Sequence, residues 1–306
     1  MRVGVVDLGT NSTRLLAADV EGERVEEVER RTEITRLGEG VDERRKLLPL
    51  PIARVRNVLS DYRRELERLG AERVLTIATS AVRDAENGEA FLGEIEWSYG
   101  FTTRLLTGGE EAALALRGVA TGRRLDEGTL VLDVGGGSTE LITTGERTSI
   151  DVGSVRLSER HLHSDPPSRD ELEAAARDVR RLLPRLEPSG AIGVAGTITT
   201  LAALELGGYD AARVHGYRLS REAVEQQLER LAALPLAERR ELPGLEPERA
   251  PVILGGVVIV REVLERYGLD ALEVSERDLL HGAALEAAQL PEPVEGDAPP
   301  GAYTCC

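Results

Sequence analysis

The chain has 306 residues, of which 41% are apolar and 30% are charged, a composition typical of a globular protein long enough for two domains. No run approaches the roughly eighteen uncharged apolar residues of a membrane-spanning helix, which argues against a membrane protein. The formal net charge of −16 argues against a nucleic-acid partner, because such binding needs a basic face that displaces phosphate counterions.

The first half of the chain reads as strands followed by alternating helices and strands. Its first segment contains Asp7 and lacks the apolar region of a signal peptide, so we expect a cytoplasmic location. Residues 36–51 hold Gly, Pro and charges and are predicted to form a loop. Apolar spacing predicts a hairpin at 2–19, strands at 24–35, 74–79 and 103–106, and helices at 52–69, 85–93 and 110–121.

The second half opens in the same way. The pattern predicts a hairpin at 131–142, strands at 146–152, 191–196 and 272–274, and helices at 169–186, 198–206, 222–233, 250–267 and 275–289. Ser275 and Asp278 are placed as a capping box for the closing helix. The sequence from Leu290 is rich in Pro and Gly and is expected to be disordered. The expected domains are residues 1–123 and 124–289, with a tail at 290–306.

The two halves repeat the same Gly-rich turn at an offset of 126 residues, since 133 − 7 = 126. The matched pairs are Asp7 with Asp133, Gly9 with Gly135, Ser12 with Ser138, and Thr13 with Thr139. This repeat indicates a duplicated domain and predicts two similar α/β domains that face each other across a cleft.

Each turn is predicted to bind phosphate, because a Gly-rich turn between buried strands can point successive backbone N–H groups at an anion. The alternatives are a flexible linker for the GGGS run and a turn-forming role for each Asp. Two Asp residues at equivalent strand ends favour a metal site. The predicted phosphate-binding residues are Gly9, Thr10, Asn11, Ser12, Gly135, Gly136, Gly137, Ser138 and Thr139.

Several segments resemble known families. DLGTNSTRLL from Asp7 and DVGGGSTEL from Asp133 resemble the two phosphate motifs of the actin, Hsp70 and sugar-kinase superfamily, and VAGTITTLAAL from Val194 resembles its third site. IATSAVRDAENGEAFL, LLTGGEEAALALRGV and ERAPVILGGVVIVREVL resemble the exopolyphosphatase and guanosine pentaphosphate phosphatase (Ppx/GppA) family over residues 2–289. The resemblance implies an α/β fold of two similar actin-like (ribonuclease H-like) domains with an interdomain active-site cleft, in the family's short two-domain form.

The resemblance also implies site residues. Glu111 matches the catalytic base, beside Glu110, and Arg83 matches an arginine near the phosphate. Without the resemblance, the two glutamates would read as a solvated helix start and Arg83 as a surface partner of Asp84 or Glu86.

A divalent cation is part of the same expectation. We expect Mg²⁺, with Mn²⁺ as the other candidate, held by Asp133 with Asp7 and Glu140 contributing directly or through water. Gly196 and Thr197 are expected to line the far wall of the cleft, although Thr197 could instead cap the following helix.

The expected activity is hydrolysis of the terminal phosphate of inorganic polyphosphate by direct water attack. Guanosine pentaphosphate is the alternative substrate. From other classes, a sugar-kinase-like ATPase and a non-catalytic polyphosphate or nucleotide sensor stay open. No membrane partner is expected, and a homodimer is left open as the assembly.

Overall fold

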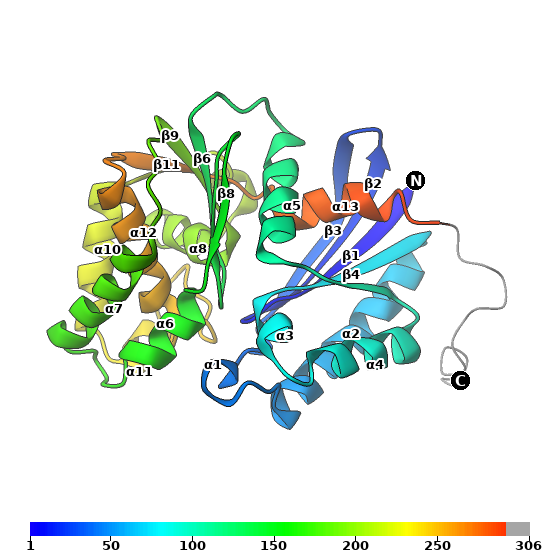
Figure 1. The fold of residues 1–306 in the computed structure, drawn as a ribbon, viewed down its shortest axis with the longest axis horizontal. Helices are drawn as coiled ribbons and strands as arrows, with labels where there is room; N and C mark the ends of the chain where they lie inside the picture. The colour runs from blue at the N-terminus through cyan, green and yellow to red at the C-terminus, as the bar shows by residue number, and fades with distance from the viewer. Residues whose placement is uncertain (292–306) are drawn as a thin grey trace. The chain divides into compact units, whose positions relative to one another are not determined.

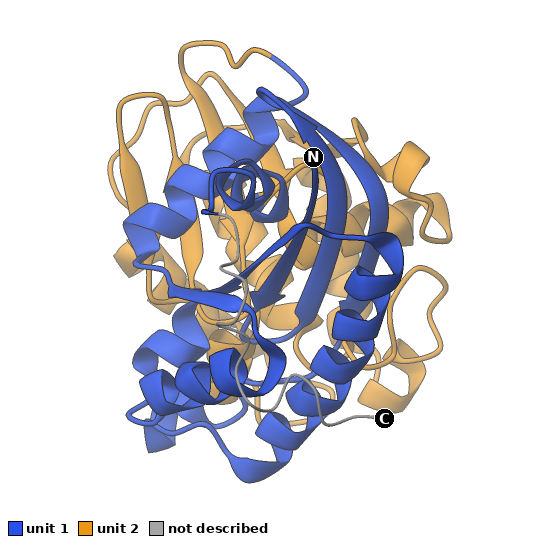
Figure 2. Cartoon of the chain, turned by 90° about the vertical axis from the view of Figure 1, so that its right-hand side faces the viewer, with its two compact units in different colours: residues 1–123, 279–306 blue, residues 124–278 orange. Residues whose placement is uncertain are grey.

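The computed structural model describes residues 1–291, and the chain forms two compact units (Figure 2). Unit 1 comprises Met1–Arg123 and the segment from Leu279 onward, and unit 2 comprises Arg124–Asp278. The predicted tail lies, from residue 292, outside the described residues. No helix within residues 1–291 is long and apolar enough to cross a bilayer, and the cytoplasmic location stays a prediction.

Unit 1 is built on a five-stranded mixed sheet in the order β3-β2-β1-β4-β5. The first three strands pair antiparallel, and β4 and β5 continue the sheet parallel to β1 (Figure 1). The strands are β1 (Arg2–Leu8), β2 (Thr13–Glu21), β3 (Arg24–Glu33), β4 (Arg73–Ala78) and β5 (Thr102–Leu105).

Strand β1 is buried on both faces, which explains its nearly continuous apolar sequence. Val6 and Leu8 belong to one apolar cluster, with residues of helix α2 (Pro49–Leu69) and helix α4 (Gly88–Tyr99). Val3 and Val5 alternate with them and belong to a second cluster. Unit 1 therefore has a helical layer on each side of its sheet.

The helices of unit 1 differ in part from the predicted ones. Helix α2 begins at Pro49, within the predicted loop, and ends at Leu69, followed by the cap residue Gly70, whose φ of 71° suits glycine. The predicted helix at 85–93 is wrong in its bounds, because the chain forms α3 (Ser80–Asp84) and then α4. The remaining helices of this region are α1 (Val41–Arg44) and α5 (Gly108–Ala120).

The closing helix α13 (Leu279–Ala287) packs in unit 1, beside α5 (Figure 1). The two helices approach so closely that a Cβ atom on Gly282 would lie 2.1 Å from the carbonyl oxygen of Leu114. The second domain was expected to extend to residue 289, whereas the observed unit 2 ends at Asp278 and helix α13 belongs to unit 1. The predicted start of this helix at Ser275 is also wrong, because Ser275 instead bonds to the backbone of Arg277.

Unit 2 repeats the plan of unit 1 with a six-stranded sheet in the order β10-β11-β9-β6-β7-β8. Strands β6, β7 and β8 pair antiparallel as β1, β2 and β3 do, and β9 and β11 follow in parallel. The strands are β6 (Thr129–Val134), β7 (Thr139–Ile142), β8 (Arg147–Ile150), β9 (Gly190–Val194), β10 (Arg218–Ser220) and β11 (Ala271–Val274). The predicted duplicated α/β fold class is confirmed.

Seven helices surround this sheet within the described residues. Helix α12 (Ile253–Arg266) is buried around most of its circumference, which explains its run of Val, Ile and Gly residues. Helix α6 (Ser154–His161), the short helices and β10 were not predicted. The helices are α6 (Ser154–His161), α7 (Arg169–Leu182), α8 (Ala195–Leu206), α9 (Ala211–Val214), α10 (Arg221–Ala233), α11 (Leu236–Arg239) and α12 (Ile253–Arg266).

Candidate active site

The two Gly-rich turns have the same geometry. In unit 1 the N–H of Gly9 donates to the carbonyl of Ser12 at 3.0 Å, and in unit 2 the N–H of Gly135 donates to the carbonyl of Ser138 at 3.1 Å. The flanking strands also share their register, since Leu8 faces Thr13 and Val134 faces Thr139. The repeat seen in the sequence is therefore a repeat of backbone structure.

Each turn presents backbone N–H groups that make no backbone hydrogen bond within residues 1–291. The N–H groups of Asn11 and Ser12 in unit 1, and of Gly136 and Gly137 in unit 2, donate to no backbone carbonyl of these residues. Backbone donors are rarely left without a partner when a segment is buried. Successive N–H groups of this kind form the concave anion site expected for a phosphate.

The side chain of Asn11 adds an observation that points to a ligand. Asn11 is only 6% exposed, and neither its amide nitrogen nor its amide oxygen has a hydrogen-bond partner among the described residues. A buried amide without partners is costly, by about 1–3 kcal/mol for each unsatisfied group. Ser138 and Thr139 are buried as well, and the hydroxyl of Thr139 already donates to the carbonyl of Val152 at 2.6 Å.

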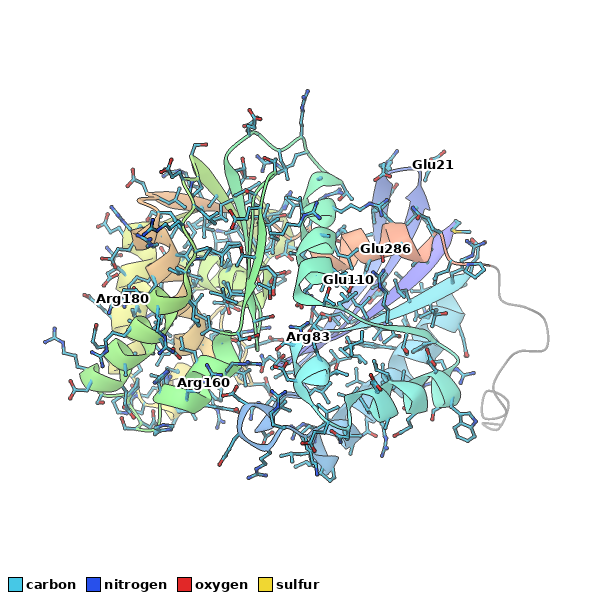
Figure 3. The ribbon with its side chains drawn as sticks, in the orientation of Figure 1. Glu21, Arg83, Glu110, Arg160, Arg180 and Glu286 are labelled. Atoms are coloured by element: carbon cyan, nitrogen blue, oxygen red, sulfur yellow. The ribbon has the colours of Figure 1, made fainter. Side chains whose placement is uncertain are left out.

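Glu110 is committed to the start of helix α5. Its carboxylate accepts the backbone N–H and the hydroxyl of Thr107, and the Thr107 hydroxyl accepts the N–H of Glu110, which completes a capping box. Arg104 binds the same carboxylate and also pairs with Glu286. Glu110 on α5 and Glu286 on α13 are labelled in Figure 3. The backbone bond from Thr107, followed by the bond from Arg104, lowers the pKa of Glu110 to about 2.

Glu111, by contrast, is 7% exposed and lies on the buried face of helix α5. Its carboxylate lies 3.3 Å from the guanidinium of Arg83, which comes from helix α3. The same guanidinium nitrogen donates to the carbonyl of Leu106 at 2.8 Å, so Arg83 is held from two sides. Arg83 therefore pairs with Glu111 and does not form the alternative surface ion pair with Asp84 or Glu86.

Unit 2 places two buried carboxylates opposite one another. Asp133, which is 6% exposed, faces Glu140, which is fully buried, across the β6–β7 pair. Cross-strand partners project on the same face, where two like charges destabilise each other unless a cation offsets them. The Ser149 hydroxyl donates to Glu140 at 2.7 Å. Oxygen donors of this kind fit Mg²⁺, which typically takes one or two carboxylates together with water and phosphate.

No group of three or more His, Cys, Asp or Glu side chains within the described part of the chain is placed to hold a metal ion. A site on two carboxylates is compatible with that result. Asp7, the counterpart of Asp133, has another partner in unit 1: Arg14 binds its Oδ2 atom at 2.7 and 2.8 Å.

The third motif lies at the start of helix α8. Ala195 has a φ of 69°, which is uncommon for a residue with a Cβ atom and occurs more often at functional sites. A Cβ atom on Gly196 would lie 2.3 Å from the guanidinium of Arg249, so this guanidinium packs directly against the glycine and would have to move if residue 196 carried a side chain. The alternative role of Thr197 as a helix cap is wrong, because α8 begins at Ala195 with Val194 as its N-cap. Sequence reasoning missed Arg249, although its segment ERAPVI was noted.

A duplicated α/β fold with two phosphate-type turns and a partly buried Glu111–Arg83 ion pair has the features of a phosphate-handling protein. The model of the Ppx/GppA phosphatase family matches residues 15–290, and the chain belongs to this family. The prediction of an enzyme of the phosphatase class is confirmed by this match.

The relatives agree with the family. The chain is 42% identical to "Exopolyphosphatase 2" of Mycobacterium tuberculosis, covering 94% of this chain and 98% of that protein. A solved structure of an exopolyphosphatase-like protein is 33% identical with a TM-score of 0.87, covering 94% of this chain and 99% of the other. The Aquifex aeolicus member of the family is 31% identical with a TM-score of 0.77, covering 94% and 98%.

Proposed function

We propose that this protein is an exopolyphosphatase that hydrolyses the terminal phosphoanhydride bond of inorganic polyphosphate and releases orthophosphate. The observation that carries the proposal is the ion pair of buried Glu111 with partly exposed Arg83, in a chain that also has two phosphate-type turns. The family and the relative named exopolyphosphatase support the same substrate.

In the proposed reaction Glu111 acts as the general base. Its carboxylate accepts a proton from a water molecule, and the water oxygen attacks the terminal phosphorus. The bond from this phosphorus to the bridging oxygen breaks, and the bridging oxygen keeps the electron pair as part of a chain that is one phosphate shorter. No covalent phosphoenzyme forms, because the water attacks phosphorus directly.

Charge stabilisation falls to Arg83 and to the turns. We assign the Arg83 guanidinium to an oxygen of the terminal phosphate, since it is already anchored by the Leu106 carbonyl. In each unit the turn's N–H groups that make no backbone bond among residues 1–291 would supply neutral donors to phosphate oxygens, and in unit 1 the Asn11 amide would add to them. Neutral donors suit this protein, because its net charge of −16 gives no general attraction for an anion.

Magnesium, or manganese, completes the proposal. Asp133 and Glu140 of unit 2 are the residues that would hold the ion. Asp7, the counterpart of Asp133 in unit 1, is already bound by Arg14. When bound, the ion supplies positive charge to the phosphate oxygens. Gly196, Thr197 and the nearby Arg249 would form a further phosphate-binding site within unit 2.

Guanosine pentaphosphate is the second candidate substrate, because the family includes both kinds of phosphatase. Its terminal 5′ phosphate is joined by the same kind of bond and would use the same groups.

Phosphate release from purified protein tests the proposal, with polyphosphates of several lengths, guanosine pentaphosphate and ATP measured side by side. We expect the fastest release from polyphosphate in the presence of Mg²⁺. Faster release from guanosine pentaphosphate would favour the second candidate, and preferential cleavage of ATP would favour a kinase-like ATPase. Binding of polyphosphate without any phosphate release would identify a sensor.

A further inference from the structure

The carbonyl side of the first turn is covered by the segment that follows the third strand of unit 1. After β3 ends, the N–H of Arg36 donates to the carbonyl of Asn11 at 2.9 Å, and the N–H of Gly38 donates to the carbonyl of Thr10 at 2.8 Å. Arg36 adopts a φ of 50°, which is uncommon for a residue with a side chain. The segment 36–38 is therefore held against the turn at a conformational cost.

Unit 2 has a similar arrangement, but it is shifted by one residue along the turn and is formed by a helix instead of a loop. After β8 ends, the N–H of Ser154 donates to the carbonyl of Gly135 at 2.9 Å. The N–H groups of Val155 and Arg156 both donate to the carbonyl of Gly136, at 2.8 and 3.1 Å. These residues form the first turn of helix α6. The first N–H groups of a helix have no acceptor within the helix, and here they donate to the carbonyls of the phosphate-type turn.

These bonds fix the direction of the amides that face the substrate. In a planar trans peptide group, the carbonyl and the N–H of the next residue point in opposite directions. Binding the carbonyls of Thr10 and Asn11 on one side therefore aims the next N–H groups, on Asn11 and Ser12, to the other side. In unit 2 the held carbonyls of Gly135 and Gly136 aim the N–H groups of Gly136 and Gly137, which donate to no backbone carbonyl among the described residues.

A glycine in each segment permits this close contact. A Cβ atom on Gly153 would lie 2.4 Å from the carbonyl carbon of Gly136 and 2.5 Å from the nitrogen of Gly137. The obstructing atoms are the backbone of the turn itself, which no rotation of a side chain can clear. A Cβ atom on Gly38 would lie 2.2 Å from a methyl group of Thr10.

We propose that Gly38 and Gly153 are positioning residues for phosphate binding. In this proposal neither glycine contacts the substrate. Each glycine allows a capping segment, 36–38 or 153–156, to pack against a turn. The N–H groups of that segment bind the turn's carbonyls and thereby orient the turn's own N–H groups toward the phosphate. This inference rests on the proposed function, because it assumes that the turns bind phosphate.

Gly153→Ala tests the inference, with Gly190→Ala as the control, since a Cβ atom on Gly190 meets nothing within 4 Å. We expect kcat/KM for polyphosphate to fall about 100-fold in Gly153→Ala, the scale of loss when reacting groups are misplaced by about 1 Å. Gly190→Ala is expected to match the parent protein. In unit 1, Gly38→Ala is compared with Gly93→Ala, whose Cβ atom also meets nothing within 4 Å.

A second readout separates positioning from folding. Binding of tripolyphosphate is measured by calorimetry in the Glu111→Gln background, where no turnover disturbs the measurement, and it is expected to weaken when Gly153→Ala is added. A purely structural glycine would lower the unfolding temperature while the folded protein kept its KM, kcat and tripolyphosphate affinity. That result would overturn the inference.

Ser154→Pro supplies a variant that does not depend on Gly153. Proline is tolerated at the first position of a helix, but here it removes the N–H that binds the Gly135 carbonyl. Arg169→Pro, at the first position of helix α7, is its control. If Gly153→Ala does not fold, unchanged kinetics in both Ser154→Pro and Gly38→Ala overturn the inference. A parent protein that releases no phosphate refutes the proposed function, whereas an active parent with unimpaired variants refutes only this inference.

Discussion

Replacing Glu111 with glutamine removes the proposed general base while leaving its surroundings in place. The glutamine side chain has nearly the same size as that of glutamate and keeps an oxygen that can accept from Arg83, whose guanidinium lies 3.3 Å from the Glu111 carboxylate in the parent protein. Arg83 also keeps its bond to the Leu106 carbonyl, so the fold should tolerate the change. Loss of general-base catalysis lowers kcat by about 10²- to 10⁴-fold, which corresponds to about 2.7–5.4 kcal/mol of transition-state stabilisation.

Stopped-flow or continuous phosphate release gives kcat, and calorimetry gives the affinity for polyphosphate. We expect the affinity to stay near that of the parent protein, because the substitution leaves the backbone N–H groups of the turns untouched. Glu110→Gln is the matched control: its carboxylate belongs to the capping box, so its loss should affect stability and leave kcat unchanged. A Glu111→Gln variant with the parent's kcat, together with an inactive Glu110→Gln variant, would show that the assignment within this pair is wrong.

Three further predictions concern the metal, pH and substrate length. Asp133→Asn should raise the Mg²⁺ concentration for half-maximal rate by about tenfold or more, because an amide is a weaker ligand of a hard cation; an unchanged metal titration removes Asp133 from the site. The pKa of Glu110 is lowered to about 2, so its contribution to stability is present above about pH 4.5 and is lost as the pH falls toward 2. Thermal unfolding across this range should therefore show a weaker pH dependence in Glu110→Gln, and equal curves would contradict the capping role. Short polyphosphates should be used more efficiently than very long ones, because distant phosphates meet an acidic protein; kcat/KM measured across chain lengths at two ionic strengths checks this, and affinity that rises steadily with length would oppose it.

The sequence predicted the repeated turns because their geometry depends on local residues. Two apolar strands joined by a Gly-rich turn form a hairpin wherever they occur, so the match of Gly9 with Gly135 carried over into matching hydrogen bonds. The pairing of Asp133 with Glu140 follows from the same hairpin register. The preference for Glu111 over Glu110 came from family resemblance, and the structure supplies a physical reason in the capping box of Glu110.

Contacts between distant segments could not be predicted in this way. Helix α13 was assigned to the second domain from its position in the chain, but its partners α5 and β1 lie more than 150 residues earlier. Arg249 approaches Gly196 from a distant loop, and no local sequence pattern predicts that contact. Helix α6 has few apolar residues, and its start is explained by the turn that accepts its N–H groups.

The most direct test of the proposed activity follows the products of a polyphosphate of defined length by phosphorus NMR, with purified protein and Mg²⁺. If the protein removes terminal phosphates, we expect orthophosphate from the first turnovers while the chains shorten by one phosphate at a time. Glu111→Gln in the same experiment should leave the chains intact. Fragments of intermediate length before orthophosphate, or no change in the polyphosphate while ATP is consumed, would contradict the assignment of this protein as an exopolyphosphatase.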